Sequence, residues 1–411
     1  NTPKIRFKGF KDDWEQRKLS EICERITRKN RNNESDLPLT IASQFGLIDQ
    51  RDFFNKIVAA KDMSNYYLLK KGEFAYNKSY SNGFDYGSIK RLNAYKQGCL
   101  STLYICFGIT SDEVESDYLE CFFDTLKWYG DVSMICAEGA RNHGLLNVDT
   151  KGFFDEVTVD LPKSLEEQKR ISAYLNALNH LITLHQRKCD ETKQLKKFML
   201  QKMFPKNGEK NPEIRFEGFT DDWEQRKLID YLDVSNEKNK KGDYKKTDVL
   251  SVSGEVGIVN QIEFQGRSFA GVSVENYGIV NEGDVVYTKS PLKANPYGII
   301  KTNKGKAGIV STLYAVYKPK ENTDSNFVQI YFELDSRMNS YMHPLVNKGA
   351  KNDMKVSDEN ALKGNVTFPK INEQKAISNF ITELDNLITL HQRKCEKLKE
   401  LKKFMLQNMF V

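Results

Sequence analysis

The chain contains two copies of one arrangement, and this repeat limits the possible folds more than any other feature of the sequence. The segment IRFKGFKDDWEQRKL at Ile5–Leu19 returns as IRFEGFTDDWEQRKL at Ile214–Leu228, with thirteen of fifteen positions identical. Two further strings occur unchanged in both halves, LITLHQRKC at 181–189 and 387–395 and LKKFMLQ at 195–201 and 401–407. Their offset of 206 residues is far longer than a solenoid repeat, so a unit of domain plus helix has been duplicated.

Between these blocks the two halves agree only at short strings. The strings keep an offset of 210 or 211 residues, which indicates that the two middle regions share a fold while their other side chains differ. Two copies of one fold with different surfaces suggest two different ligands of the same kind, and alike edges suggest one type of partner bound twice. Duplication followed by uneven sequence drift would leave the same pattern without any difference in function between the middle regions and the edges. The strings are KGEFAYNKS and EGDVVYTKS (71–79, 282–290), Tyr-Gly (86–87, 297–298), STLY (101–104, 311–314), and GARN and GAKN (139–142, 349–352).

A long helix is predicted at the end of each half. Residues 165–203 contain neither Gly nor Pro, and apolar residues recur from Ile171 through Leu175 and Leu178 at coiled-coil-like spacing. A helix of about 40 residues would be roughly 60 Å long at about 1.5 Å per residue. Because one apolar face must be buried, its natural partner is the other copy. If the halves are related by a pseudo-two-fold axis, the helices run antiparallel with the domains at opposite ends.

The middle regions are predicted to be rich in strands. The segments 98–109 and 308–319 carry β-branched and aromatic residues bordered by Gly or Pro, which is typical of buried strands. The fold class is therefore α+β, with two similar strand-rich domains separated by two long antiparallel coiled-coil helices in a pseudo-two-fold repeat. The predicted boundaries are 1–163 for the first domain, 164–204 for the first helix, 205–213 for a linker, 214–370 for the second domain and 371–411 for the second helix.

Composition narrows the function only slightly. A formal net charge of +6 permits nucleic-acid binding without requiring it. The seven cysteines are scattered with no C-x-x-C pair, which fits free thiols better than a disulfide framework or a zinc site. No apolar run approaches the length of a membrane span, and no apolar region follows the charges of NTPKIRFKGF, so we expect a cytoplasmic chain.

The repeat resembles the specificity subunits of type I restriction-modification enzymes. The resemblance covers essentially the whole chain. It rests on the order domain–helix–domain–helix, on the DDWEQRKL openings at 12–19 and 221–228, and on the paired EQK…LITLHQRKC…LKKFMLQ helices. The tandem combination is specific, whereas a single WEQRKL string would only be suggestive.

The resemblance implies how such a chain works. Each domain would be a target-recognition domain that reads one half of a bipartite site in double-stranded DNA. The helices would set the gap between the half-sites and dock two methyltransferase (modification) subunits, which restriction/translocase subunits then join. The chain itself would bind no cofactor, and S-adenosylmethionine, ATP and Mg²⁺ would be held by the partner subunits. In agreement, the sequence has no G-x-x-x-x-G-K-[ST] phosphate loop.

Candidate DNA contacts lie in loops that begin alike in the two halves and then diverge. Base edges specify sequence, while Lys and Arg contacts to phosphate give position and affinity. A solvated polar loop, or core packing for the tyrosines, is the alternative interpretation. The candidates are Lys78, Ser79, Tyr80, Asn82, Tyr86, Arg141 and Asn142 in the first half, and Lys289, Ser290, Lys293, Asn295, Tyr297, Lys351 and Asn352 in the second.

A second set of residues is expected at an interface. Trp14 and Trp223, inside the near-identical openings, would close each repeat against the opposite helix or touch a partner subunit. The histidines of LITLHQRKC continue the helical seam and are better explained by packing than by catalysis. The seam residues are Leu178, Ile182, His185, Leu384, Ile388 and His391.

Two other functional classes stay open from the sequence. The first is an enzyme, because Asn295-Pro296-Tyr297-Gly298 is similar to the motif with which amino-methyltransferases hold a flipped adenine. The fourth residue is Gly, however, and no glycine-rich cofactor loop is evident, so we interpret the string as a recognition loop. The second is a scaffold that binds protein through its coiled coil and never touches DNA.

Overall fold

A computed structural model describes residues 2–42, 46–54, 56, 58–79, 83–142, 145–206, 208–291, 295–348 and 354–411, without the side chains of 137–142, 145, 347–348 and 354–355. The chain forms two compact units. Unit 1 comprises Asn1–His185 and Arg393–Val411, and unit 2 comprises Gln186–Gln392. The division falls inside both long helices, whereas the predicted boundaries gave each helix a segment of its own.

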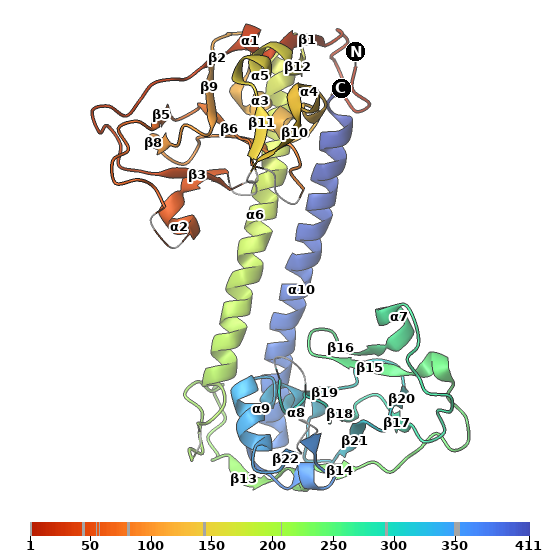
Figure 1. Ribbon diagram of the computed structural model, residues 1–411. Coiled ribbons are helices and arrows are strands. Elements are labelled where there is room, and N and C mark those ends of the chain that lie inside the picture. Colours follow the sequence, from red (N-terminus) through yellow and green to blue (C-terminus); the bar gives the residue numbers. More distant parts are fainter. Residues whose placement is uncertain are drawn as a thin grey trace. The chain divides into compact units, whose positions relative to one another are not determined.

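Unit 1 is a mixed domain of short strands and helices, labelled in Figure 1. It ends in the first part of the long helix α6 (Leu165–Lys202). The other elements are β1 (Glu15–Lys18), α1 (Leu19–Ile22), β2 (Cys23–Arg25), β3 (Leu39–Ala42), β4 (Gly46–Asp49), α2 (Gln50–Phe54), β5 (Tyr67–Lys70), β6 (Phe74–Asn77), β7 (Ser88–Arg91), β8 (Gln97–Leu100), β9 (Ile105–Ile109), α3 (Ser116–Phe123), α4 (Tyr129–Ile135), β10 (Cys136–Asn142), β11 (Leu145–Val148), α5 (Thr150–Glu156) and β12 (Thr158–Leu161).

Unit 2 follows nearly the same order of elements and leads into the long helix α10 (Ile371–Asn408). Its short 3-10 helices are η1 (Leu228–Asp230), η2 (Lys246–Asp248) and η3 (Asn360–Leu362). The other elements are β13 (Glu224–Lys227), β14 (Leu232–Val234), β15 (Leu250–Ser253), β16 (Gly257–Asn260), α7 (Gln261–Gln265), β17 (Gly278–Val280), β18 (Val285–Thr288), β19 (Ile300–Thr302), β20 (Gly308–Val310), β21 (Tyr314–Pro319), α8 (Ser325–Tyr331), α9 (Asp335–Met342), β22 (Asn347–Lys348), β23 (Met354–Lys355) and β24 (Asn365–Phe368).

The same sheet forms the centre of each unit. Its strand order is β2-β9-β6-β7 in unit 1 and β14-β21-β18-β19 in unit 2. Because side chains alternate across a strand, Phe74 and Tyr76 of β6 enter one core while Ala75 enters the core on the other face. In β18, Val285 and Val286 are divided between two cores in the same way. The predicted α+β class with two similar strand-rich domains is confirmed.

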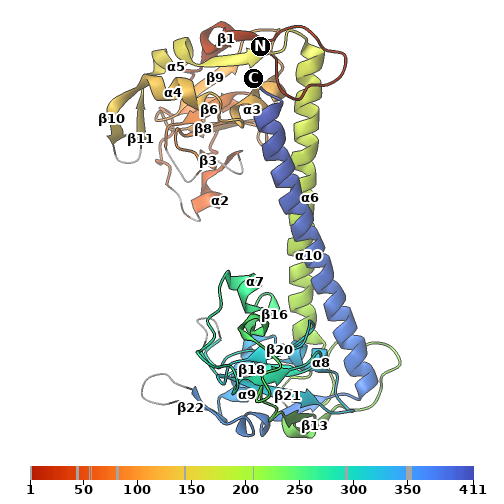
Figure 2. The ribbon, with the colours of Figure 1, turned by 90° about the vertical axis from the view of Figure 1, so that its right-hand side faces the viewer.

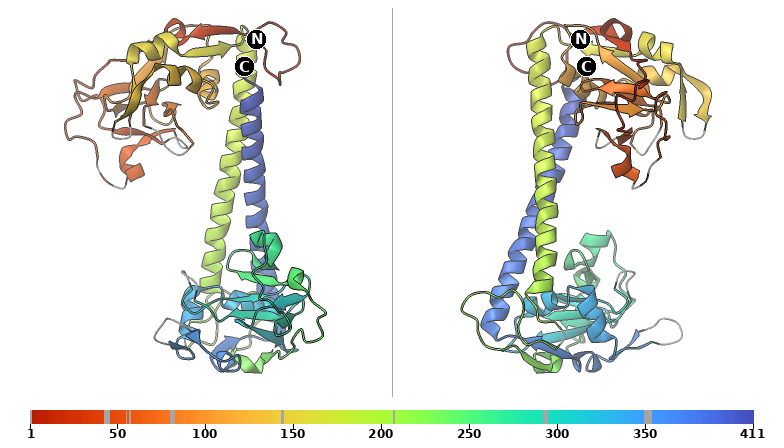
Figure 3. Two further views of the ribbon diagram at one scale, coloured as in Figure 1. Left: turned by 45° about the vertical axis from the view of Figure 1, so that its right-hand side comes forward. Right: turned by 90° about the vertical axis from the view of Figure 1, so that its left-hand side faces the viewer.

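The ends of the long helices complete the cores of the units. In unit 1, Leu175 of α6 and Phe410, just after α10, belong to one core. In unit 2, Phe204, just after α6, shares a core with Ile381 of α10. The start of one helix therefore meets the end of the other, so the paired segments run in opposite directions within each unit. The two ends of the chain lie beside each other in unit 1 (Figure 3), where the Ile5 amide donates to the Asn408 carbonyl at 2.9 Å.

A buried ion pair ties each near-identical opening to the helix of its own half. Arg6 donates through Nε and Nη2 to the two carboxylate oxygens of Glu167 at 2.7 and 2.9 Å. Arg215 makes the same pair with Glu373 at 2.7 and 2.8 Å. Both carboxylates are almost fully buried. Such charge-assisted, two-point bonds fix direction as well as distance, which explains why both partners of the pair recur in the two halves.

Some local predictions need correction. The strand-rich segments 98–109 and 308–319 are each broken by a turn, between β8 and β9 and between β20 and β21. The helices α8 and α9 are separate, because Leu334 adopts an extended backbone as the N-cap of α9. The strands β12 and β24 directly precede the two long helices. All seven cysteines are free thiols. Among the described residues, no helix is both long and apolar enough to cross a bilayer.

A lysine from the far end of α10 docks against the core of unit 1. Lys402 and Lys90 approach the two carboxylate oxygens of Asp124 at 3.1 and 2.6 Å. Burial raises the pKa of Asp124, but the two lysines outweigh it, and the net result is a pKa below the usual value. The corresponding lysine in unit 2, Lys196, contacts Asp385 at 2.7 Å and also contacts Glu333.

The Asp124 contact should make the stability of the chain depend on pH. A carboxyl group with a depressed folded pKa contributes stability above its ordinary pKa of about 3.9, and this is lost as pH falls through the lower folded value. Asp124→Asn should lower the free energy of unfolding by about 2 kcal/mol at neutral pH. The deficit should shrink as the pH falls below the ordinary pKa of an aspartate, where the carboxyl group becomes protonated in the folded chain. Urea unfolding over a pH series measures both effects.

The matched control is Asp112→Asn, because Asp112 is an exposed carboxylate in the same unit. It should change the unfolding free energy by less than about 0.5 kcal/mol at every pH. An Asp124→Asn deficit that stayed constant across the series would contradict the role of the charge.

Candidate nucleic-acid interface

Two of the shared strings of the middle regions lie side by side at one end of the central sheet. In unit 1, β6 pairs with β9 so that Tyr76 faces Ile105, and continuing this register brings Lys78 opposite Leu103. In unit 2, Thr288 faces Tyr314, and the Lys289 amide donates to the Leu313 carbonyl at 3.2 Å. The Lys-Ser and S-T-L-Y strings are therefore neighbours in both units, and we call this region the shared sheet end.

The Tyr-Gly string anchors the chain at the same end. The hydroxyl of Tyr76 donates to the Tyr86 carbonyl at 2.8 Å, and that of Tyr287 donates to the Tyr297 carbonyl at 2.9 Å. The glycine that follows has φ of +82° in unit 1 and +75° in unit 2, where a Cβ would lie 2.1 Å from the Asn77 carbonyl and 2.0 Å from the Thr288 carbonyl. Only glycine fits so close to the neighbouring backbone at such a φ.

The hairpin that carries Gly-Ala-Arg-Asn also reaches the shared sheet end of unit 1. The Leu146 amide of β11 donates to the Lys78 carbonyl at 2.9 Å. Arg141 and Asn142 lie at the end of β10, and Asn142 pairs with Leu145. Figure 2 shows this hairpin beside α4. The predicted residues Tyr80, Asn82, Lys293, Lys351 and Asn352 lie outside the described residues.

The polar candidates differ in their contacts. Lys289 Nζ pairs with Asp358 Oδ1 at 2.8 Å, and both side chains are largely covered. Asn295 donates to the carboxylate of Asp335. Lys78, Ser79 and Ser290 are half-buried, and the Ser79 amide donates to the Asn77 side chain at 3.0 Å. The structure therefore brings Lys78 and Ser79 together with Tyr86, and Lys289 and Ser290 together with Tyr297.

The tyrosines of the Tyr-Gly strings lie against the core. Tyr297 is only 6% exposed, and its ring lies 6.1 Å from that of His343. Tyr86 packs at the edge of its core with its ring 5.4 Å from that of Tyr129. These positions favour packing, the alternative interpretation, over a contact with DNA. The Asn-Pro-Tyr-Gly string accordingly forms a tyrosine anchor and a tight glycine turn.

The predicted interface residues lie where the helices meet the domains. Trp14 stacks edge-on 6.4 Å from Phe410, and Trp223 lies 6.0 Å from Phe204. Each tryptophan therefore contacts the aromatic residue that follows the helix of the other half. Of the seam residues, Leu178, Leu384 and Ile388 are buried, and Ile182, His185 and His391 are half-buried.

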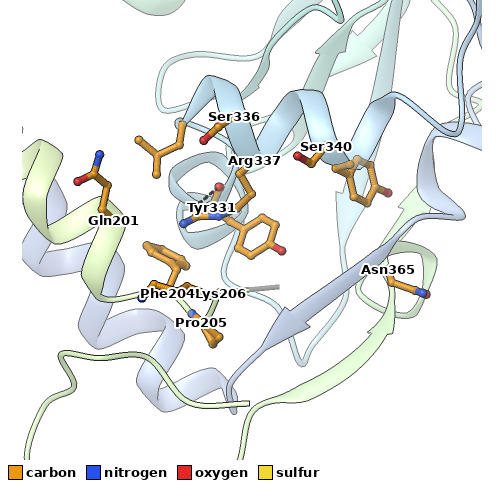
Figure 4. A pocket seen from close by; sticks show the side chains of 11 residues that line it. Gln201, Phe204, Pro205, Lys206, Tyr331, Ser336, Arg337, Ser340 and Asn365 are labelled. Atoms are coloured by element: carbon orange, nitrogen blue, oxygen red, sulfur yellow. Dashed lines mark hydrogen bonds between the residues drawn. The ribbon is translucent and has the colours of Figure 1, made fainter. Parts of the chain in front are cut away.

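A cavity of about 450 Å³ lies in unit 2 where the chain leaves α6 (Figure 4). Arg337 lines it, with its guanidinium 4.4 Å from the Phe204 ring centre. Arg337 donates to the Tyr331 carbonyl at 2.7 Å and to the Leu200 carbonyl at 3.1 Å. Burial lowers the pKa of this arginine. Because these contacts tie α9 to the ends of α6 and α8, we assign Arg337 to docking of the long helix.

Sequence reasoning missed the leucine of the S-T-L-Y string. Leu103 and Leu313 are exposed, in turns expected to be interior strand. The identical string in both halves was the available signal, but its position next to Lys-Ser depends on strand register. Among the described residues, no group of three or more His, Cys, Asp and Glu could hold a metal ion.

Comparisons with known proteins agree on one family. Residues 220–400 match the model of the type I restriction modification DNA specificity domain. A putative type I restriction enzyme MjaX specificity subunit of Methanocaldococcus jannaschii is 23% identical, and the alignment covers 98% of this chain and 94% of that protein.

Solved structures of the same kind of protein are also similar. The S subunit of a type I restriction-modification system from M. genitalium has a TM-score of 0.57 at 11% identity, over 100% of this chain and 99% of that one. This likeness supports the fold. The HsdS subunit of Thermoanaerobacter tengcongensis has a TM-score of 0.45 at 17% identity, over 98% and 97% of the two chains.

A matched pair of glycines tests the shared sheet end. Gly298 and Gly283 both have positive φ, but a Cβ at Gly283 would meet nothing within 4 Å. Gly283→Ala should therefore cost about 1 kcal/mol of backbone strain. Gly298→Ala should cost about 3 kcal/mol, because strain and a backbone clash add. Thermal unfolding measures both, and equal losses would show that the close approach to Thr288 does not constrain the fold.

Proposed function

Because the chain belongs to the specificity subunits of type I restriction-modification enzymes, we propose that its two domains read the two halves of a bipartite DNA target. One observation carries the proposal. Six residues separate Lys-Ser from Tyr-Gly in both halves, YSNGFD at 80–85 and PLKANP at 291–296, and no aligned position is identical. A loop with fixed anchors, fixed length and changed side chains suits two readers of different base sequences.

The two kinds of residue would divide the work. Lys78 and Lys289, at matched positions, suit phosphate contacts, which give position and affinity irrespective of sequence. The loop residues between the anchors would meet base edges, together with Arg141 and Asn142 and their counterparts Lys351 and Asn352. Arginine suits guanine and asparagine suits adenine because each can form two hydrogen bonds in the major groove.

The segments that are nearly identical in the two halves would bind one type of partner. We infer that the paired helices dock two methyltransferase subunits and hold the domains at a set spacing, and that restriction/translocase subunits join this core. S-adenosylmethionine, ATP and Mg²⁺ would bind to those partners, in the cytoplasm. The chain would supply sequence specificity for adenine methylation and carry out no chemistry itself.

The direct test assembles the chain with its methyltransferase subunits and maps the methylated adenines in genomic DNA. Methylation at one bipartite sequence with a constant gap is expected. The chain alone, incubated with DNA, a labelled methyl donor and Mg²⁺, should transfer no methyl group. Turnover by the chain alone would favour an enzyme. A complex that assembled but showed no salt-sensitive binding to DNA would favour a scaffold. Binding through phosphate contacts should weaken as the salt concentration rises.

The role of the helices predicts the gap. Four residues inserted between Gln186 and Arg187, and four between Gln392 and Arg393, lengthen the two helices at matched points. The added length is about 6 Å, near two base-pair steps of about 3.4 Å. The gap in the methylated sequence should lengthen by one or two base pairs with both half-sites unchanged.

The control places the same four residues after Gly208, which is exposed outside the helix. This variant should methylate the original sequence with the original gap. A longer gap in the control, or an unchanged gap in the helix variant, would contradict the spacing role of the helices.

A further inference from the structure

The S-T-L-Y turn at each shared sheet end presents its leucine to solvent. Leu103 is 58% exposed and Leu313 is 63% exposed, although both sit beside well-packed strands. The flanking residues repeat the same pattern, since the threonine before each leucine is exposed and the tyrosine after it is half-buried. Drift would readily replace an exposed leucine in middle regions that differ at most other positions. The presence of this leucine in both middle regions suggests that its side chain contacts a ligand of the chain.

The turn that carries the leucine is built in the same way in both units. The Leu103 amide donates to Ser101 Oγ at 3.3 Å, and the Leu313 amide donates to Ser311 Oγ at 3.3 Å. The tyrosine amide then donates to the serine carbonyl, at 3.2 Å in unit 1 and 3.0 Å in unit 2. These bonds fix the backbone of a tight turn, so the leucine is held outward by a rigid support.

The surroundings of the leucine favour DNA over protein as its contact. A protein docking site needs roughly 800 Å² on each partner around a buried apolar centre, and leucine is under-represented among binding hot spots. Among the described residues of the turn, each leucine is flanked by Thr and Ser. Lys78 lies opposite Leu103 in the strand register, and the backbone amide of Lys289 donates to the Leu313 carbonyl. Leucine is one of the apolar side chains that DNA-bending proteins insert between base steps, in addition to their Lys and Arg contacts.

We propose that Leu103 and Leu313 are wedge residues that enter the DNA groove and part a base step in each half-site. The inference rests on the proposed function. Because the two domains read different sequences, a residue identical in both contacts a feature common to all duplexes, which is base stacking. Lys78 would hold the adjacent phosphate in unit 1, whereas in unit 2 the Lys289 ammonium is paired with Asp358. The wedge would add affinity and distort the duplex without encoding sequence.

The test uses the chain assembled with its methyltransferase subunits and a target duplex carrying 2-aminopurine at successive positions outside the methylated adenines. With the unchanged chain, fluorescence should rise at one step in each half-site as that step unstacks. Leu103→Ala should abolish the rise in one half-site, and Leu313→Ala the rise in the other. The double variant should bind the target about tenfold more weakly, as expected from losing two apolar contacts, and should methylate the same sequence.

Two control variants distinguish insertion of the leucine from a general effect of truncating an exposed side chain. Met134→Ala removes a side chain that is 86% exposed on α4 in unit 1, and it should leave both signals unchanged. Leu103→Met keeps an apolar side chain of similar length and should restore the signal. Equal binding and fluorescence for the double variant and the unchanged chain would overturn the wedge but leave the proposed function intact.

Loss of the methyltransferase subunits from the double variant, measured by light scattering, would instead assign the leucines to a protein interface and overturn the proposal. If the complex with the unchanged chain bound no duplex, the proposed function itself would fail, and this result is distinguishable from failure of the wedge alone.

Discussion

The burial of a helix end from one repeat in the core of the other is the interaction on which the structure depends. Phe410 and Phe204 follow the ends of α10 and α6, and each packs against the tryptophan of a near-identical opening. A helix of 38 residues cannot bury its apolar stripe against its own domain alone. Without Phe410 or Phe204, the corresponding core would contain a large cavity beside its tryptophan. Neither repeat therefore completes its core from its own segment, which explains why the openings and helix ends have diverged least.

Charged contacts at the helix ends keep the same lysine and one carboxylate after the preceding short helix, Asp124 or Glu333, but unit 2 adds a second carboxylate. Lys196 and Lys402 belong to identical strings, yet Lys196 pairs with two carboxylates and Lys402 with Asp124. Asn179 stands at the position in α6 that Asp385 occupies in α10. A partly buried ammonium needs at least one anionic or strongly polar partner, but several arrangements satisfy it. The contact between each helix end and its core therefore tolerates changes in the charged residues. The aromatic packing, rather than the number of ion pairs, determines how the helix end is placed.

The sequence predicted the architecture well because its signals were local or repeated. A duplicated string reveals a duplicated unit, and a long run without Gly or Pro reveals a helix. It predicted the shared sheet end poorly, because strand register joins residues that are 25 positions apart, such as Lys78 and Leu103. The role of Tyr297 was also open from the sequence, since a tyrosine suits both DNA stacking and a core. Only burial and the hydroxyl contact of Tyr287 favour the core.

The anchors of the recognition loops separate what must stay the same from what can change. Tyr76 and Tyr287 hold the far end of each loop through a hydroxyl bond to the backbone, which is indifferent to the side chains between the anchors. Gly87 and Gly298 then bring the chain back against β6 and β18. Because these two anchors at the end of each loop accept through backbone atoms, the residues between can exchange donors, acceptors and charges without removing them. A fixed frame of this kind lets one fold acquire a new target sequence through side chains alone, at little cost in stability.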